Sequence, residues 1–116
     1  MPLHFMLITN QGNGIITEKM ARKIITRLRT RIDSIDRRIA RLLLKRARFV
    51  KEIGSLKKKK NLPLVDRDRE KRIEERIEAL RTDAITKDAV KRVYRAIFEG
   101  SYDIEKGGRT GDDQGN

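Results

Sequence analysis

Three basic residues are placed where they could bind an anion. Arg46 occupies an apolar position within a long run of regularly spaced aliphatic residues, and Arg29 and Lys57 flank the same run. A buried guanidinium costs free energy unless an anion accompanies it. The pattern therefore favours a site for a small, multiply charged anion. An interhelical salt bridge, or an Arg46 whose stem packs while its head group reaches water, also accounts for this residue.

Two groups of polar residues are spaced to share one side of a helix. Asp66, Arg69 and Glu70 stand at positions i, i+3 and i+4, and Ser101 and Glu105 stand at positions i and i+4. Each group projects in one direction, as a binding site requires. Helix capping with a surface ion pair also explains the first group, and incidental polarity at a fraying helix end also explains the second.

The residue types that are missing exclude several kinds of catalysis. The 116 residues include no cysteine and one histidine, His4. Disulfides, thiolate nucleophiles and cysteine metal sites are excluded. Neither a transition-metal site nor a Ser/His/Asp or Cys/His nucleophile is expected. We therefore predict chemistry that uses no metal and no cofactor.

Length and composition indicate one small, basic domain. Charged residues make up 40% of the chain and aromatic residues 4%, with no tryptophan, which leaves little bulky material for a self-sufficient core. The net charge of +12 indicates an anionic partner, either nucleic acid, a membrane surface or a small anion. No apolar run is long enough to cross a membrane, and the start lacks a secretory signal, so we expect a soluble cytoplasmic protein.

Apolar residues recur at spacings of three and four along the first half of the chain. The series is Ile25, Leu28, Ile32, Ile35, Ile39, Leu42, Phe49, Ile53 and Leu56, with Arg46 in its seventh place, between Leu42 and Phe49. This repeat predicts the seam of a long helix that packs against other helices at a shallow angle. Thr17 provides an N-cap, and no proline intervenes before about Lys59, so the helix is expected to span roughly 60 Å.

Two shorter helices are predicted to follow. Pro63 marks a loop, and the second helix begins around Asp66, which caps it, and continues through Leu80. The third begins near Thr86 and ends by Gly107. These helices are too short to cover the long seam, so a second chain is needed. The predicted fold is all-α: a three-helix protomer with one very long N-terminal helix, in an intertwined homodimeric helical bundle.

An antiparallel pair of long helices brings the flanking cations together. Arg29 and Lys57 are separated by about 42 Å along one helix, too far to touch the same small ligand. Their positions are symmetric about residue 43, so in a pair centred near Leu43 Arg29 of the partner subunit lies level with Lys57. The dimer therefore predicts two equivalent basic pockets, each built from both chains.

The two ends of the chain differ from the helical region. Residues 1–16 combine a short apolar patch with Asn- and Gly-rich sequence, which predicts a flexible arm. Residues 107–116 are Gly-rich and polar, which predicts a disordered tail. Neither end has the Gly-Lys-Ser/Thr sequence of a phosphate loop.

Four segments, in this order along the chain, resemble one known family. They are residues 28–36 (LRTRIDSID), 42–46 (LLLKR), 50–57 (VKEIGSLK) and 63–70 (PLVDRDRE). Together they resemble the all-helical chorismate mutases of the bacterial and archaeal monofunctional type, over about residues 20–105. The resemblance implies a chorismate mutase domain at residues 17–106. It also implies a cofactor-free Claisen rearrangement of the dianion chorismate to prephenate, in phenylalanine and tyrosine biosynthesis.

The resemblance identifies Arg46, Lys57 and Glu105 as the catalytic residues. Arg46 and Arg29 of the partner subunit would hold the two carboxylates, and Lys57 would bind a carboxylate and the breaking ether oxygen. Glu105 stands where bacterial relatives have a glutamine that donates a hydrogen bond to that oxygen. Because a carboxylate donates only when it is protonated, we expect turnover to fall as pH rises through the titration of Glu105.

The resemblance gives the remaining polar residues supporting roles at the substrate. Asp66 and Glu70 would meet the ring hydroxyl and the backbone, Arg69 would support the pocket, and Ser101 would contact the ring carboxylate. Isochorismate pyruvate-lyase, which has the same fold, is an alternative, but that group lacks the arrangement of Asp66, Arg69 and Glu70.

Two further alternatives belong to other functional classes. A basic helical module that binds nucleic acid would fit the net charge, but stacking aromatics are scarce and no recognised binding motif is present. A regulatory or structural dimer that keeps the fold without activity is the other. We expect chorismate and a second copy of the chain as partners, and neither nucleic acid nor a membrane.

Overall fold

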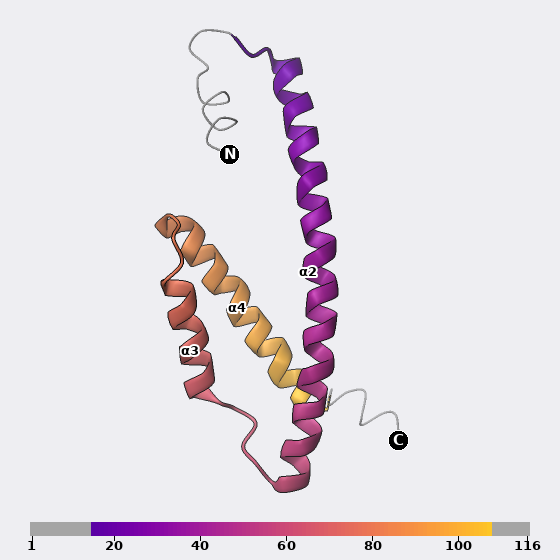
Figure 1. Cartoon of the computed structure of the whole chain (residues 1–116), viewed down its shortest axis with the longest axis vertical. Helices are drawn as coiled ribbons and strands as arrows, with labels where there is room; N and C mark the ends of the chain where they lie inside the picture. The colour runs from indigo at the N-terminus through magenta and orange to yellow at the C-terminus, as the bar shows by residue number, and fades with distance from the viewer. Residues whose placement is uncertain (1–14, 108–116) are drawn as a thin grey trace. The chain divides into compact units, whose positions relative to one another are not determined.

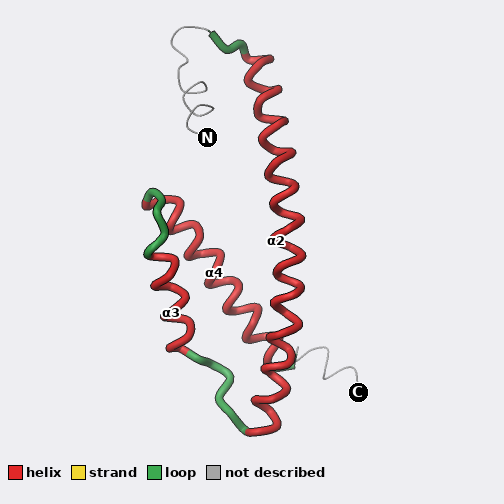
Figure 2. Tube along the Cα trace, viewed as in Figure 1, coloured by secondary structure: helices red, strands yellow, loops and turns green. Residues whose placement is uncertain are grey.

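The computed structural model describes residues 15–107, which form three α-helices and no strand (Figures 1 and 2). They are α2 (Glu18–Lys60), α3 (Arg67–Glu78) and α4 (Ala84–Glu105). The predicted all-α protomer with one very long first helix is thereby confirmed. His4 and most of the predicted arm and tail lie outside the described residues. The chain forms two structural units, one ending at Leu42 and the other beginning at Leu43, so that α2 contributes to both.

Capping and charge define the two ends of α2. The Met20 N–H donates to Thr17 Oγ1 at 3.1 Å, as expected of an N-cap. Glu18 lies in the first turn and four lysines lie in the last, where each charge is favoured by the helix dipole. Asn61 then adopts a φ of 58°, the left-handed conformation that commonly ends a helix. The predicted extent of this helix is confirmed.

The first unit presents an apolar face along α2. Along α2 the exposed fractions include 41% at Ile25, 52% at Ile32, 51% at Ile35 and 48% at Ile39. A row of exposed isoleucines on one helix is a contiguous apolar patch of the kind that marks an interaction surface.

Helix α3 begins and packs as its sequence predicts, but it ends earlier. Asp66 Oδ1 accepts a hydrogen bond from the Arg69 backbone N–H at 3.0 Å, which confirms Asp66 as the N-cap. Ile73 and Ile77 are buried, whereas Leu80 is 48% exposed and lies after the last helical residue. The prediction of a helix through Leu80 was therefore slightly too long, because the apolar spacing continues past the point where the backbone turns.

Helix α4 begins before the predicted residue. Asp83 is its N-cap, with Oδ1 accepting from the Thr86 N–H at 2.7 Å and Oδ2 accepting from Thr86 Oγ1 at 3.0 Å. A start near Thr86 was wrong because Thr86 lies inside the first turn as the partner of the cap. The helix ends at Glu105, and Gly107 follows with a φ of 89°, which confirms the predicted end.

Helices α3 and α4 form a pair joined by polar contacts as well as by their apolar faces. Lys87 Nζ donates to the Glu78 carbonyl oxygen at 2.7 Å, and Lys91 forms an ion pair with the Glu78 carboxylate. The buried apolar residues of the described chain are Val50, Ile73 and Ile77. The apolar core formed by these residues is small.

Within residues 15–107, none of the helices has the length and apolar character needed to span a membrane.

Candidate active site

The second unit contains a pocket of about 360 Å³ lined by the end of α2, the following loop, α3 and α4. Seven of the eight residues predicted from the sequence line it: Arg46, Lys57, Asp66, Arg69, Glu70, Ser101 and Glu105. Apolar side chains, among them Val50, Ile53 and Phe98, complete the wall. Cations beside an apolar wall act in a poorly hydrated setting, where their electrostatic effect is stronger than in water.

Arg46 reaches the pocket from α2 and is oriented by α4. Its Nη1 donates to Ser101 Oγ at 2.5 Å, and Ser101 Oγ donates in turn to the Ile97 carbonyl oxygen at 2.8 Å. No carboxylate within residues 15–107 forms an ion pair with Arg46, so the predicted salt bridge is not formed in this chain. A guanidinium has five N–H donors, and the contact with Ser101 leaves several for an anion in the pocket.

Lys57 is fixed at two points near the end of α2. Its Nζ donates to Glu105 Oε1 at 2.7 Å and to the Leu64 carbonyl oxygen at 2.8 Å. The Lys57 and Glu105 side chains are 17% and 13% exposed, so this ion pair is mostly shielded from water. Because an ammonium has three N–H bonds, the two contacts leave the third for a ligand.

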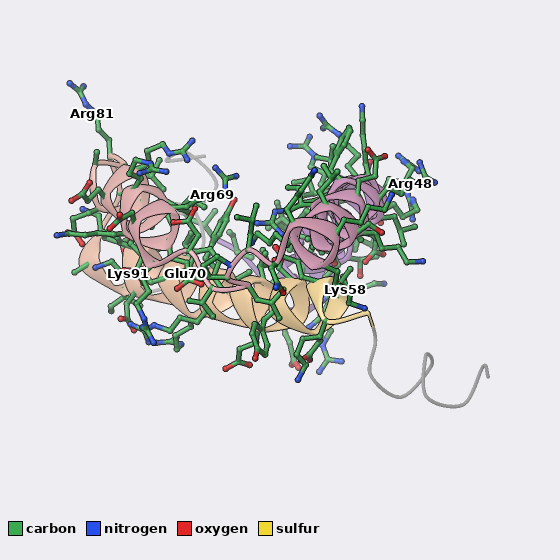
Figure 3. The ribbon with its side chains drawn as sticks, turned by 90° about the horizontal axis from the view of Figure 1, so that it is seen from below. Arg48, Lys58, Arg69, Glu70, Arg81 and Lys91 are labelled. Atoms are coloured by element: carbon green, nitrogen blue, oxygen red, sulfur yellow. The ribbon has the colours of Figure 1, made fainter. Side chains whose placement is uncertain are left out.

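The residues predicted to share one side of the second helix do line the pocket together. Asp66 also caps α3, as the structural alternative required. Glu70 is half-buried and Arg69 is exposed, and Figure 3 labels both on α3. No ion pair joins these side chains within the described part of the chain. The helix thus adds carboxylates and a cation to the pocket on the side opposite α2.

Comparison with known proteins decides the family. A family model described as chorismate mutase type II matches residues 28–106, which include every residue that lines the pocket. This chain belongs to the chorismate mutase type II family. The bifunctional chorismate mutase/prephenate dehydratase of Aquifex aeolicus (strain VF5) is 39% identical over 83 residues, which are 68% of this chain and 23% of that protein. The chain therefore spans about a quarter of the length of this relative, and the predicted resemblance to the family is confirmed.

Arg29 is the predicted site residue that does not line the pocket. It lies on the exposed surface of α2 in the first unit, with no hydrogen bond or ion pair within residues 15–107. The sequence placed this residue in the site of a chorismate mutase only as a contribution of the partner subunit. The contribution of Arg29 from the partner subunit stays a prediction.

Sequence reasoning missed the backbone and apolar parts of this chorismate mutase pocket. The Leu64 carbonyl oxygen that fixes Lys57 gave no signal, because any residue type supplies such an oxygen. Phe98 and Tyr102 lie on the same helix as Ser101 and Glu105 and line the pocket beside them. Phe98 lies three residues before Ser101, a spacing that places both on one side of a helix and could have indicated it. Tyr102 directly follows Ser101, and this spacing gives no such signal.

Proposed function

We propose that this protein is a cytoplasmic enzyme that rearranges chorismate to prephenate in the biosynthesis of phenylalanine and tyrosine. One observation carries the proposal: a chain of the chorismate mutase family holds Arg46 and Lys57 in one pocket, each fixed by a second side chain. Chorismate carries two carboxylates, a ring hydroxyl and an enolpyruvyl ether. The pocket offers a cation or a polar group suited to each of these.

The chemistry requires positioning and charge stabilisation rather than a nucleophile. In the Claisen rearrangement the ether C–O bond breaks as a C–C bond forms between the enolpyruvyl group and the ring, in one cyclic movement of electrons. No proton is transferred and no covalent intermediate forms. Negative charge develops on the ether oxygen, so a fixed donor at that oxygen lowers the barrier. Holding the substrate in its folded conformer supplies the other part of the acceleration.

Lys57 is the donor to the ether oxygen, and Arg46 binds a carboxylate. Two of the three Lys57 N–H bonds are engaged by Leu64 and Glu105, which fixes the direction of the third. Ser101 holds Arg46 in place. Its hydroxyl donates to the Ile97 carbonyl oxygen, so it contacts the ring carboxylate only by rotating away from that partner. Both cations are anchored before substrate binds, so little reorganisation is needed during the reaction.

The carboxylates on α3 recognise the uncharged end of the substrate. Glu70 is half-buried and lines the pocket without an ion-pair partner in residues 15–107, so it can accept a hydrogen bond from the ring hydroxyl. Asp66 Oδ1 is engaged by the backbone of Arg69, which leaves Oδ2 for the substrate. Arg69 balances the charge of the two carboxylates.

The active form is an antiparallel, intertwined homodimer in which Arg29 of the partner subunit completes each site. Support comes from the exposed isoleucine face of α2, which needs an apolar cover. A second hollow of about 340 Å³, lined by residues such as Ile77, Leu80 and Val90, lies beside the first and shares Arg46 and Arg69 with it. Its apolar side chains, which lie beside three arginines, suit contact with another helix. A closed two-fold pair satisfies both surfaces at once.

Removing Arg46 tests the function directly. Purified protein is incubated with chorismate, and both chorismate loss and prephenate formation are followed. We expect Arg46→Ala to lower kcat/KM by roughly two to three orders of magnitude, because removing one partner of a buried, hydrogen-bonded charge pair costs about 2 to 5 kcal/mol. Arg48→Ala is the matched control, since Arg48 is exposed on the same helix and directed away from α3 (Figure 3).

Three outcomes would contradict the proposal. Absence of prephenate with the wild-type protein would overturn it. Formation of salicylate and pyruvate from isochorismate, with no reaction of chorismate, would assign the protein to the pyruvate-lyases. An equal effect of Arg46→Ala and Arg48→Ala would show that the pocket is not where the reaction occurs.

A further inference from the structure

Helices α2 and α4 approach each other closely at a glycine. Gly54 is buried, and a Cβ atom built on it would lie 2.7 Å from the Glu105 carbonyl oxygen and 2.8 Å from Glu105 Cα. Real Cβ atoms essentially never make contacts shorter than 3.0 Å. Both obstructing atoms belong to the backbone, so no side-chain rotation relieves the overlap. Any larger residue at this position must push the two helices apart.

The crossing point lies next to the pair of charged groups in the pocket. Glu105 is the last residue of α4, and its carboxylate accepts the hydrogen bond from Lys57 at 2.7 Å. Lys57 follows Gly54 by three residues, so the two project from neighbouring positions on one face of α2. Figure 1 shows the C-terminal end of α4 against this part of α2. The separation of the two backbones at Gly54 therefore sets the separation of Lys57 and Glu105.

We propose that Gly54 is a positioning residue for the rearrangement: by lacking a side chain it sets the distance between Lys57 and Glu105. This inference rests on the proposed function, because it concerns the placement of the donor to the ether oxygen. Gly54 itself contacts no substrate. It acts through the backbone of Glu105, and so through the direction of the Lys57 N–H bonds.

The size of the displacement follows from the contact distances. Ordinary van der Waals contact begins at 3.4 Å, so a Cβ now at 2.7 Å requires a shift of about 0.7 Å, the difference between the two. A misplacement of about 1 Å in a catalytic group can cost about 10²-fold in rate. We therefore expect Gly54→Ala to lower kcat roughly 10- to 100-fold. KM should change less, because Arg46, which binds a carboxylate, lies two turns earlier on α2.

Gly100 provides a matched control within the same protein. It lies inside α4, and a Cβ built on it meets nothing within 4 Å. Gly100→Ala is thus the same chemical change without the overlap. Alanine also has a higher helix propensity than glycine. We expect Gly100→Ala to keep kcat within about 2-fold of wild type and to raise the Tm.

A double-mutant cycle separates positioning from general damage. The Glu105→Ala variant lacks the carboxylate whose distance from Lys57 is set by Gly54. Adding Gly54→Ala to this variant should therefore lower its kcat by no more than about 3-fold. A merely structural role predicts the same fold loss in both backgrounds. If Gly54→Ala alone is too unstable to assay, Gly54→Ala/Gly100→Ala is compared with Gly100→Ala, since the second alanine restores helix propensity.

The outcomes distinguish this inference from the proposed function. No turnover of chorismate by the wild-type protein would overturn both. Wild-type turnover with an unchanged kcat in Gly54→Ala would overturn the inference alone, as would equal losses with and without the Glu105 carboxylate. The expected result is that Gly54→Ala lowers kcat strongly when Glu105 is intact and little in the Glu105→Ala background. Gly100→Ala should leave kcat unaffected.

Discussion

At the scale of single residues, the site depends on cations whose positions are fixed before a ligand arrives. Arg46 is held by Ser101, and Lys57 is held by Glu105 and by the Leu64 carbonyl oxygen. The sequence marked both cations, because each departs from the expected residue type or lies in a family motif. It did not show what holds Lys57, because that depends on a loop carbonyl and on a contact between helices.

Glu105 is the residue whose hydrogen-bonding capacity should decide the pH dependence of turnover. A protonated carboxyl donates to the ether oxygen and an ionised one does not, so turnover should fall as pH rises. Glu105→Gln donates at every pH and should give a flat profile. The measurement is kcat against pH for both proteins, with Glu99→Gln, an exposed change on the same helix, as the control.

The comparison of the two profiles decides the role of Glu105. If wild type and Glu105→Gln have the same pH profile, the carboxyl does not donate in the reaction and serves only to hold Lys57. A Glu99→Gln profile that differs from wild type would instead attribute the effect to the net charge of the helix.

At the scale of helices, apolar spacing predicted the number and order of elements, and polar contacts decided where they end. The 3,4 repeat gave α2 almost in full. The predicted start of α4 was two residues late because Asp83 and Thr86 are both residue types that suit a helix start. The hydrogen bond from the Thr86 N–H that makes Asp83 the cap cannot be read from the spacing of apolar residues. The close approach at Gly54 was unpredictable for a similar reason, since it depends on how two helices cross.

The Asp83 cap should make the stability of α4 sensitive to acid. Hydrogen bonds from the Thr86 backbone N–H, and then from its hydroxyl, lower the pKa of Asp83 below its ordinary value. A lowered pKa means that the cap stabilises the fold at pH above the usual range of aspartate, and that this stability is lost as pH falls through the lowered pKa. The Tm of the wild type should therefore fall on acidification, in part through this residue.

Asp83→Asn isolates that contribution, because an amide oxygen still caps the helix but does not titrate in this range. Its Tm should be less sensitive to acid than that of the wild type, whereas Asp83→Ala should have a Tm lower by a few degrees at neutral pH. Asp103→Asn, an exposed change on the same helix, should behave as the wild type. Parallel acid dependence of wild type and Asp83→Asn would show that the cap is not the titrating element.

At the scale of the whole molecule, one chain leaves much of its apolar surface uncovered. The described residues bury Val50, Ile73 and Ile77, while Leu42 remains 65% and Leu44 63% exposed on α2. The sequence anticipated this shortage from the length of the long seam and the scarcity of aromatic residues. In the proposed homodimer a second chain supplies the missing cover, and the antiparallel arrangement would also bring Arg29 of the partner subunit level with Lys57.

Mixing two inactive variants tests the shared site. Arg29→Ala retains Lys57, and Lys57→Ala retains Arg29. In a hybrid dimer one site combines both intact residues and the other combines both alanines. Random pairing of equal amounts makes half of the dimers hybrids, so about a quarter of all sites, and about a quarter of wild-type activity, should be regained. Each variant alone should be strongly impaired, because each loses a cation that binds or stabilises the substrate.

The experiment requires that the subunits exchange, so the two variants are refolded together, and the mass in solution is measured to establish a dimer. A mixture of Arg46→Ala with Lys57→Ala is the matched control, because both residues then come from the same chain in each site, and no hybrid site is intact. Activity in the first mixture and none in the second would follow from a site built across two chains. A fully active monomer would contradict both the role of Arg29 in the site and the proposed cover of the exposed face of α2. A first mixture no more active than its two parent variants would contradict the role of Arg29.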